Sequence, residues 1–330
     1  MIALLDEEKA WQHEARWLKL CRPDLGPFVT PSWAKLWRRH FGGASRLVVL
    51  AADRGSSDNG EPWALWPLES YPEGVLWHLG GREVTDYAAP LFDGDAESFA
   101  LEVAEYLSEN QSVWKQLRIE ALPGDIGFHG PLAESLASRG AKVELVFDEV
   151  CPVLDLPASF EEYLGRLDKK HRHEVRRKQR RLRSELGPPT LRVSRPETLE
   201  SDVALFFSWH RNSKGSKGGF LDAGYESFFR DVLQTSSREG WLRLSFLQVN
   251  GIPYSAIFAF EWQGRLFIYN SAHEPTARHL SPGIVHLVEE IRSGIERGLS
   301  ALDFLQGDER YKFELGAWPR QLVTVHASFE

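Results

Sequence analysis

The feature that most constrains the fold is a run of three strand patterns in close order in the second half of the chain. The patterns cover residues 241–249, 254–262 and 265–271. The first turn between them is Asn250-Gly251 and the second is Gln263-Gly264. Asn-Gly between alternating apolar runs is one of the strongest short signals for a β-hairpin. The sequence therefore predicts an antiparallel three-stranded meander with one buried face.

Helix and strand patterns divide the 330 residues into two α/β halves, a length that suits two domains of about 150 residues each. The predicted domains are 1–150 and 151–330, with the boundary in the proline-bracketed segment Cys151-Pro-Val-Leu-Asp-Leu-Pro157. In the first half we expect helices at 6–20, 31–41 and 96–110 and strands at 46–52, 63–68 and 116–121. In the second half we expect helices at 160–186, 199–212, 224–235 and 282–298 and, besides the meander, strands at 190–193, 301–305 and 322–327.

Composition favours a folded protein of the cytoplasm. Hydrophobic residues make up 42% and charged residues 26% of the chain, which argues against extensive disorder. The two cysteines, Cys21 and Cys151, belong to no CxxC or Cys/His spacing, so neither a disulfide framework nor a zinc site is expected. We also expect no signal peptide and no membrane span.

The predicted helix 160–186 concentrates positive charge in a chain whose net charge is −8. Between Arg166 and Arg183 there are ten lysines and arginines against two acids. Three interpretations stay open: a solvated helix face, a site for the phosphates of a coenzyme or of a lipid-linked group, or contact with tRNA. His171 and His173 have no third ligand in view, and no metal is expected.

A polar segment follows the predicted strand 301–305 and ends the run Phe304-Leu-Gln-Gly-Asp-Glu-Arg-Tyr-Lys312. Strand ends are where α/β enzymes commonly carry their chemistry. This run, together with the order of the elements before it, resembles the GCN5-related N-acetyltransferase (GNAT) superfamily, and within it the CelD-type, FemAB-like tandem proteins. The resemblance implies two GNAT-like lobes, each a mixed and mostly antiparallel central sheet flanked by helices.

The resemblance also implies an acyl-CoA, such as acetyl-CoA, as the donor. Its phosphates would lie at the turn before helix 282–298, at Ser281 and Gly283, because a helix N-terminus favours anions. Its pantetheine arm would lie along the third strand of the meander, near Asn270 and Ser271. The turn departs from the family pattern in having a single glycine and a proline, and an ordinary helix start is the alternative.

The resemblance implies Asp308, Tyr311 and Lys312 as catalytic residues. Asp308 or Glu309 would accept the proton of the amine, Tyr311 would protonate the leaving thiolate, and Lys312 would neutralise an oxyanion or an acidic group of the substrate. The alternative is a solvated loop in which the two acids pair with Arg310 and Lys312, a kind of pair worth at most about 1 kcal/mol.

Four residues are expected to bind the acceptor. His210 and Arg211 end a predicted helix that leads into a glycine-bearing loop ending in Phe220, which resembles another segment of the family, and His273 follows the meander. The loop lacks the Gly-x4-Gly-Lys-Ser/Thr spacing of a P-loop.

The resemblance thus implies an N-acyltransferase that moves an acyl group from acyl-CoA to an amine, on a sugar or a cell-envelope polysaccharide precursor. One alternative is a FemAB-like ligase that takes its donor from aminoacyl-tRNA. A second alternative is a binding module that recruits an anionic partner through the basic helix.

Overall fold

The computed structural model describes residues 1–53, 61–81, 83–211 and 223–329 and divides the chain into two compact units. The first lobe comprises Met1–Val150 and Arg320–Glu330, and the second lobe comprises Cys151–Pro319. The predicted second domain ran from 151 to 330, so the difference is the last segment, which packs with the first lobe. That segment belongs to β13 (Trp318–Ser328), which pairs with β6 (Gln116–Pro123) of the first lobe.

In the first lobe the strands follow the order β1-β2-β3-β4-β6-β13, and β5 pairs with β3. Its other elements are β1 (Ile2–Asp6), α1 (Glu7–Gln12), α2 (Glu14–Leu20), η1 (Pro23–Val29), α3 (Pro31–Phe41), β2 (Arg46–Ala52), β3 (Ala64–Tyr71), β4 (Val75–His78), β5 (Leu91–Phe92), α4 (Ala96–Glu109), η2 (Gly124–Ile126), α5 (His129–Ser138) and the start of β7 (Lys142–Asp155). The predicted helix 6–20 is two helices, because the chain leaves helical geometry between them at His13.

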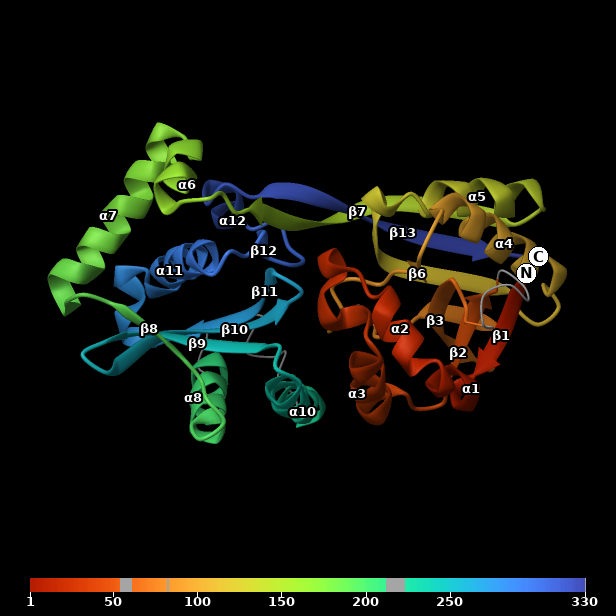
Figure 1. Cartoon of the computed structure of the whole chain (residues 1–330), viewed down its shortest axis with the longest axis horizontal. Coiled ribbons are helices and arrows are strands. Elements are labelled where there is room, and N and C mark those ends of the chain that lie inside the picture. Colours follow the sequence, from red (N-terminus) through yellow and green to blue (C-terminus); the bar gives the residue numbers. More distant parts are fainter. Residues whose placement is uncertain (54–60, 82, 212–222, 330) are drawn as a thin grey trace. The chain divides into compact units, whose positions relative to one another are not determined.

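In the second lobe the order is β7-β12-β11-β10-β9-β8. Its elements are α6 (Phe160–Arg166), α7 (Lys169–Leu186), β8 (Thr190–Val193), α8 (Leu199–Arg211), α10 (Ala223–Glu239), β9 (Leu242–Val249), β10 (Ile252–Trp262), β11 (Arg265–His273), η3 (Pro275–Leu280), α11 (Pro282–Glu296), β12 (Ala301–Asp303) and α12 (Arg310–Glu314). Helices α8 and α10 cover one face of this sheet, and α11 covers the other, with α6 and α7 packed outside it (Figure 1). The predicted meander is confirmed, because β9, β10 and β11 pair antiparallel.

The single long helix predicted over residues 160–186 is wrong. The chain turns extended at Leu167 (φ −69°, ψ 145°), and α7 begins two residues later. Asp168 explains the break, because its carboxylate accepts a hydrogen bond of 2.8 Å from the backbone N–H of His171 and so caps the new helix. Leu167 is buried in the core of the lobe, where it fixes the corner between α6 and α7.

A buried polar network fixes α11 to the sheet beneath it. The imidazole of His286 is fully buried and lies between two hydroxyl groups, with Nε2 3.0 Å from Oγ of Ser245 on β9 and Nδ1 3.1 Å from Oγ of Ser255 on β10. One turn later Glu290, also fully buried, accepts a 2.8 Å hydrogen bond from Nε of Arg243 on β9. These bonds set the rotation of α11 and with it the direction of the helix N-terminus.

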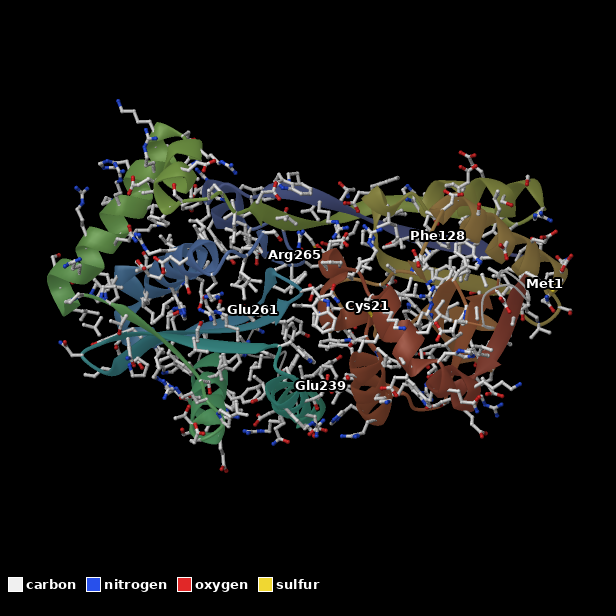
Figure 2. All side chains as sticks on the ribbon, viewed as in Figure 1. Met1, Cys21, Phe128, Glu239, Glu261 and Arg265 are labelled. Carbon is white, nitrogen blue, oxygen red and sulfur yellow. The ribbon has the colours of Figure 1, made fainter. Side chains whose placement is uncertain are left out.

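Both cysteines are buried. Cys21 lies inside the first lobe (Figure 2), and burial raises the pKa of its thiol to about 12, so the thiol stays protonated at neutral pH. Within the described part of the chain, no helix has the length and apolar character needed to cross a lipid bilayer.

The His286 network predicts a loss of stability at mildly acidic pH. The pKa of His286 is lowered to about 4, first by burial and also by the charge of Arg243, while Glu290 partly opposes the shift. An unfolded histidine titrates near pH 6.5, so the unfolded chain binds more protons between these values and the contribution is lost as pH falls from about 6.5 to about 4. We expect the free energy of unfolding, measured in urea, to fall by about 2 kcal/mol through this group between pH 7 and pH 5.

The variant His286→Gln keeps an amide that can form hydrogen bonds but does not titrate, so it should lack this component of the pH dependence. His279→Gln, at an exposed histidine of η3, is the matched control and should keep it. An unchanged slope in His286→Gln would show that the network does not hold a neutral imidazole.

Candidate active site

The backbone of the second lobe opens where β11 and β12 part. The two strands are parallel and pair at three positions, the last being Phe267 with Asp303. There β12 ends, whereas β11 continues to His273. The register between β10 and β11 also shifts at this point, since Phe258 pairs with Asn270 and the next residue of β10 pairs with Ile268. Such a bulge bends the strand and leaves a stretch of β11 beyond Phe267 without β12 as a neighbour.

Helix α11, which follows β11 after the short helix η3, begins with an open N-terminus. Ser281 adopts a left-handed conformation (φ 54°, ψ 48°), which is uncommon for a residue other than glycine, and its side chain makes no capping hydrogen bond. Pro282 occupies the first helical position. A Cβ built at Gly283 would meet no atom within 4 Å. A ligand can therefore approach the backbone here, where the N–H groups of the first turn and the helix dipole favour an anion.

Lys312 holds the loop that follows β12. Its side chain is 4% exposed, and Nζ donates to the carbonyl oxygens of Leu305 (3.2 Å), Gln306 (2.9 Å) and Gly307 (3.0 Å) and pairs with Oε2 of Glu309 (2.8 Å). An ammonium group has three protons, so these four oxygens occupy all of them. The geometry therefore supports a positioning role for Lys312, in place of the oxyanion contact that the sequence suggested.

The same loop explains the glycine of the motif. Gly307 has φ +114°, a conformation that side-chain-bearing residues rarely adopt. A Cβ at this position would lie 2.5 Å from Oε2 of Glu309 and 3.2 Å from Nζ of Lys312. The pair predicted for a solvated loop is thus present between Glu309 and Lys312, but its ammonium end is buried. Arg310 pairs instead with Glu314, 2.8 Å away on α12.

Asp308 and Tyr311 belong to the same segment as Glu309 and Lys312. Asp308 is exposed. Tyr311 is mostly buried, packs edge-on against Phe304, and lines a small cavity of about 20 Å³ with Ile284 of the first turn of α11. Burial, together with the negative charge of Glu309, raises the pKa of Tyr311 above its usual range. The structure therefore brings a protonated phenol close to the predicted donor turn.

The predicted acceptor residues lie elsewhere in the same lobe. His210 is buried at the end of α8 against Phe206, and Arg211 is paired with Glu226 of α10, 2.7 Å away. Helix α8 covers the sheet face opposite α11 (Figure 1), so the structure does not bring these two residues together with Tyr311.

Three of the remaining predicted residues lie on β11. Asn270, Ser271 and His273 are partly exposed residues of β11, and the backbone N–H of Ser271 donates to Oδ1 of Asn270 at 2.8 Å. Phe220 falls outside the described residues. The His286 network cannot be predicted from the sequence, because none of its members has a motif spacing. The holding role of Lys312 cannot be predicted either, because a motif does not show where a side chain points.

Removing the charge of Lys312 tests its positioning role. Lys312→Met keeps the aliphatic stem but leaves three carbonyl groups and one carboxylate without their cation. We expect the free energy of unfolding in urea to fall by about 2–3 kcal/mol, the usual cost of losing hydrogen bonds to a buried charge. Lys169→Met, at an exposed lysine of α7, is the control and should change it by less than about 0.5 kcal/mol. Equal effects of the two substitutions would rule out the holding role.

Comparison with known proteins identifies the fold. Residues 169–313 match the family model described as an acetyltransferase (GNAT) domain. None of the curated proteins matches the chain.

Three solved structures are similar over nearly the whole chain. FemX has a TM-score of 0.63 at 13% identity and covers 97% of this chain and 96% of its own. The C-terminal domain attributed to a lysylphosphatidylglycerol synthetase of Agrobacterium fabrum has a TM-score of 0.57 at 11% identity, covering 97% and 93%. A tandem GNAT protein from the clavulanic acid biosynthesis pathway has a TM-score of 0.50 at 11% identity, covering 99% and 98%. Residues 169–313 therefore form an acetyltransferase domain of the GNAT superfamily, within a chain that has a FemAB-like fold.

Proposed function

We propose that the chain is an N-acyltransferase that moves an acyl group from acyl-CoA to an amine on a sugar or a cell-envelope polysaccharide precursor. The GNAT-type acyltransferase fold supports transferase activity. The observation that carries the proposal is the parting of β11 and β12 next to the open start of α11. The amine and its carrier are inferred from the resemblance to CelD-type proteins, and the cytoplasm as the place of reaction is inferred from the cysteine content of the chain.

The donor would lie against backbone rather than against a dedicated set of side chains. Amides of the pantetheine arm can pair with β11 beyond Phe267, on the edge that β12 leaves. The diphosphate of the coenzyme would meet the N–H groups at Gly283 and Ile284, as the first turn of a helix favours. Pro282 contributes no N–H, and its fixed φ sets the direction of the two that follow.

Acyl transfer then needs two proton movements. The acceptor nitrogen attacks the thioester carbonyl carbon, a C–N bond forms, and the tetrahedral intermediate collapses as the C–S bond breaks. Asp308, which is exposed, takes the proton of the amine directly or through one water. Tyr311 gives its proton to the leaving thiolate. Tyr311 is protonated at neutral pH, as any tyrosine of ordinary or raised pKa is, so its proton is present when the thiolate leaves.

Gly283→Trp tests the donor position. The indole would project from an open point of the helix start and block close approach of the phosphates to the backbone. We expect calorimetric titration with acetyl-CoA and with longer acyl-CoAs to show binding to the wild type and a dissociation constant raised at least about tenfold in the variant.

Gly130→Trp is the matched control, because Gly130 in α5 of the first lobe also has open space around its Cβ position and no left-handed φ. It should bind the thioesters as the wild type does. If the wild type binds no thioester, the chain is either a ligase with another donor or a binding module for an anionic partner.

An aminoacyl-tRNA-dependent ligase is the second candidate. The observation that favours it is α7, whose arginines and lysines make an exposed basic helix in the same lobe as the candidate active site. The donor separates the two functions. Ribonuclease should abolish the activity of a tRNA-dependent ligase and leave a thioester-dependent acyltransferase unchanged.

A further inference from the structure

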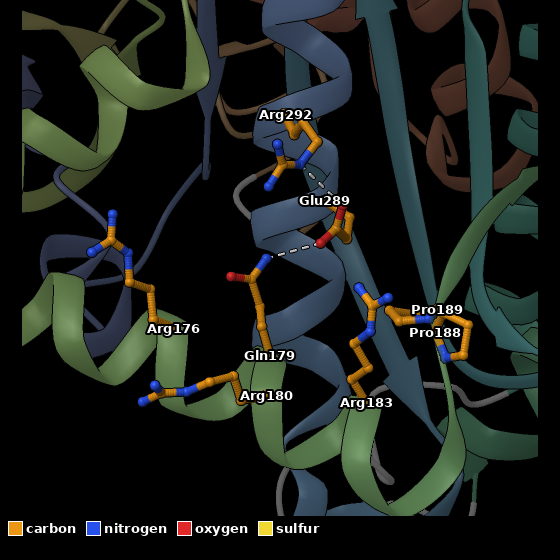
Figure 3. A pocket seen from close by; sticks show the side chains of 8 residues that line it. All are labelled: Arg176, Gln179, Arg180, Arg183, Pro188, Pro189, Glu289 and Arg292. Carbon is orange, nitrogen blue, oxygen red and sulfur yellow. Dashed lines mark hydrogen bonds and ion pairs between the residues drawn. The ribbon is translucent and has the colours of Figure 1, made fainter.

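A cavity of about 460 Å³ lies between α7 and α11, outside the candidate active site. Four of its lining side chains are arginines (Figure 3). The lining residues are Arg176, Gln179, Arg180, Arg183, Pro188, Pro189, Glu289 and Arg292. A cavity with so many guanidinium groups is built for a ligand of strong negative charge.

Three of the arginines line the cavity together because of helix geometry. Arg176, Arg180 and Arg183 are spaced by four and three residues, which places them along one face of α7. Arg292 comes from α11 on the other wall. Its guanidinium stacks over the ring of Phe160 at 3.6 Å, a contact that uses the flat face of the group and leaves its N–H edge for a hydrogen-bond acceptor.

Among the described residues that line this cavity, Glu289 is the one carboxylate, and it is already engaged. Glu289 accepts a 2.9 Å hydrogen bond from Nε2 of Gln179, and its other oxygen lies 3.4 Å from Nε of Arg292 (Figure 3). Among the described residues, Arg180 and Arg183 have no ion-pair partner, and the nearest acid oxygen to Arg176 is that of Glu161 at 4.0 Å. Most of the positive charge facing the cavity is therefore not neutralised by the protein.

Two arginines of α7 that do not line the cavity differ. Arg177 pairs with Glu174 at 2.8 Å, and Arg181 pairs with Glu185 at 3.2 Å, both within α7 itself. Within the part of the chain that the structure describes, Arg180 and Arg183 thus lack the acid partner that Arg177 and Arg181 have, although all four are exposed.

We propose that this cavity binds the diphosphate group of a ligand. One guanidinium group commonly forms two parallel hydrogen bonds to the oxygens of a phosphate. Four guanidinium groups around one cavity therefore match two linked phosphates. The volume accommodates a diphosphate and part of the group attached to it. Pro188 and Pro189 form a wall without N–H groups at the end of α7, which leaves recognition to the arginines.

The cavity is distinct from the predicted site for the phosphates of the donor. Glu289 and Arg292 follow Gly283 by six and nine residues along α11, and at 1.5 Å per residue they lie ~9 Å and ~14 Å from it along the helix axis. The proposal therefore holds whether or not the chain uses acyl-CoA.

The test is calorimetric titration with inorganic pyrophosphate, using two double variants that remove the same charge from the same helix. Arg180→Gln with Arg183→Gln removes two unpaired arginines of the cavity. Arg177→Gln with Arg181→Gln removes two paired arginines outside it. We expect the wild type to bind pyrophosphate more tightly than orthophosphate. The first variant should bind pyrophosphate at least about tenfold more weakly, as expected for the loss of one charge-assisted hydrogen bond, and the second should stay within about twofold of the wild type.

Two further arms identify the source of the diphosphate. Displacement of pyrophosphate by uridine diphosphate supports a soluble nucleotide-linked ligand, and displacement by farnesyl diphosphate alone supports a lipid-linked one. If the first double variant is destabilised, Arg176→Gln with Arg180→Gln replaces it, and the same loss of binding is expected.

Several results would overturn the proposal. If the wild type binds no pyrophosphate, the cavity is not a diphosphate site. If the two double variants lose the same amount of pyrophosphate affinity, binding depends only on the general positive charge of α7. A short RNA duplex that binds more tightly than pyrophosphate and is weakened equally by both variants would make α7 a nucleic-acid surface. Loss of pyrophosphate binding in Gly283→Trp would place the anion at the start of α11. That last arm also separates this proposal from the proposed function, since Gly283→Trp is expected to lose acyl-CoA and keep pyrophosphate.

Discussion

The structure of the second lobe depends on the separation of two parallel strands that a sheet would ordinarily keep paired. After Phe267 and Asp303, β12 stops and its chain turns into a loop whose carbonyl oxygens are taken by the buried ammonium group of Lys312. Without such a partner, buried carbonyl groups would favour continuing the ladder. At the same level along the sheet, the bulge in β11 bends β11 itself. One lysine and one bulge thus keep open the place where a ligand can pair with the sheet.

The helix that borders this opening is fixed from below. His286 and Glu290 tie α11 to β9 and β10 through buried hydrogen bonds, and this holds the helix N-terminus in one direction. Charge is organised around the same helix. Its open first turn favours one anion, and its third turn, with α7, forms the arginine cavity. An enzyme that joins a coenzyme-borne acyl group to a phosphate-linked acceptor would need two such positions within one lobe.

The sequence predicted the parts of the fold that local chemistry determines. The meander follows from Asn250-Gly251 between alternating strands, and α11 begins at Pro282 as expected of a helix-starting proline. The break at Leu167 was missed, because the charged residues around it continue a helical pattern and only the cap by Asp168 reveals it. The role of Lys312 was assigned to substrate because a motif shows which residues are near the site but not where a side chain points. Arg292 was missed as well, since its meeting with α7 is a tertiary contact.

Amide hydrogen exchange with and without acetyl-CoA tests the central claim, that the donor pairs with the parted strand and the open helix start. The account predicts slower exchange of the backbone amides at residues 269–273 of β11 and at residues 283–285 of α11, with α7 unchanged. Exchange that slows only along α7, or nowhere in the second lobe, would contradict it.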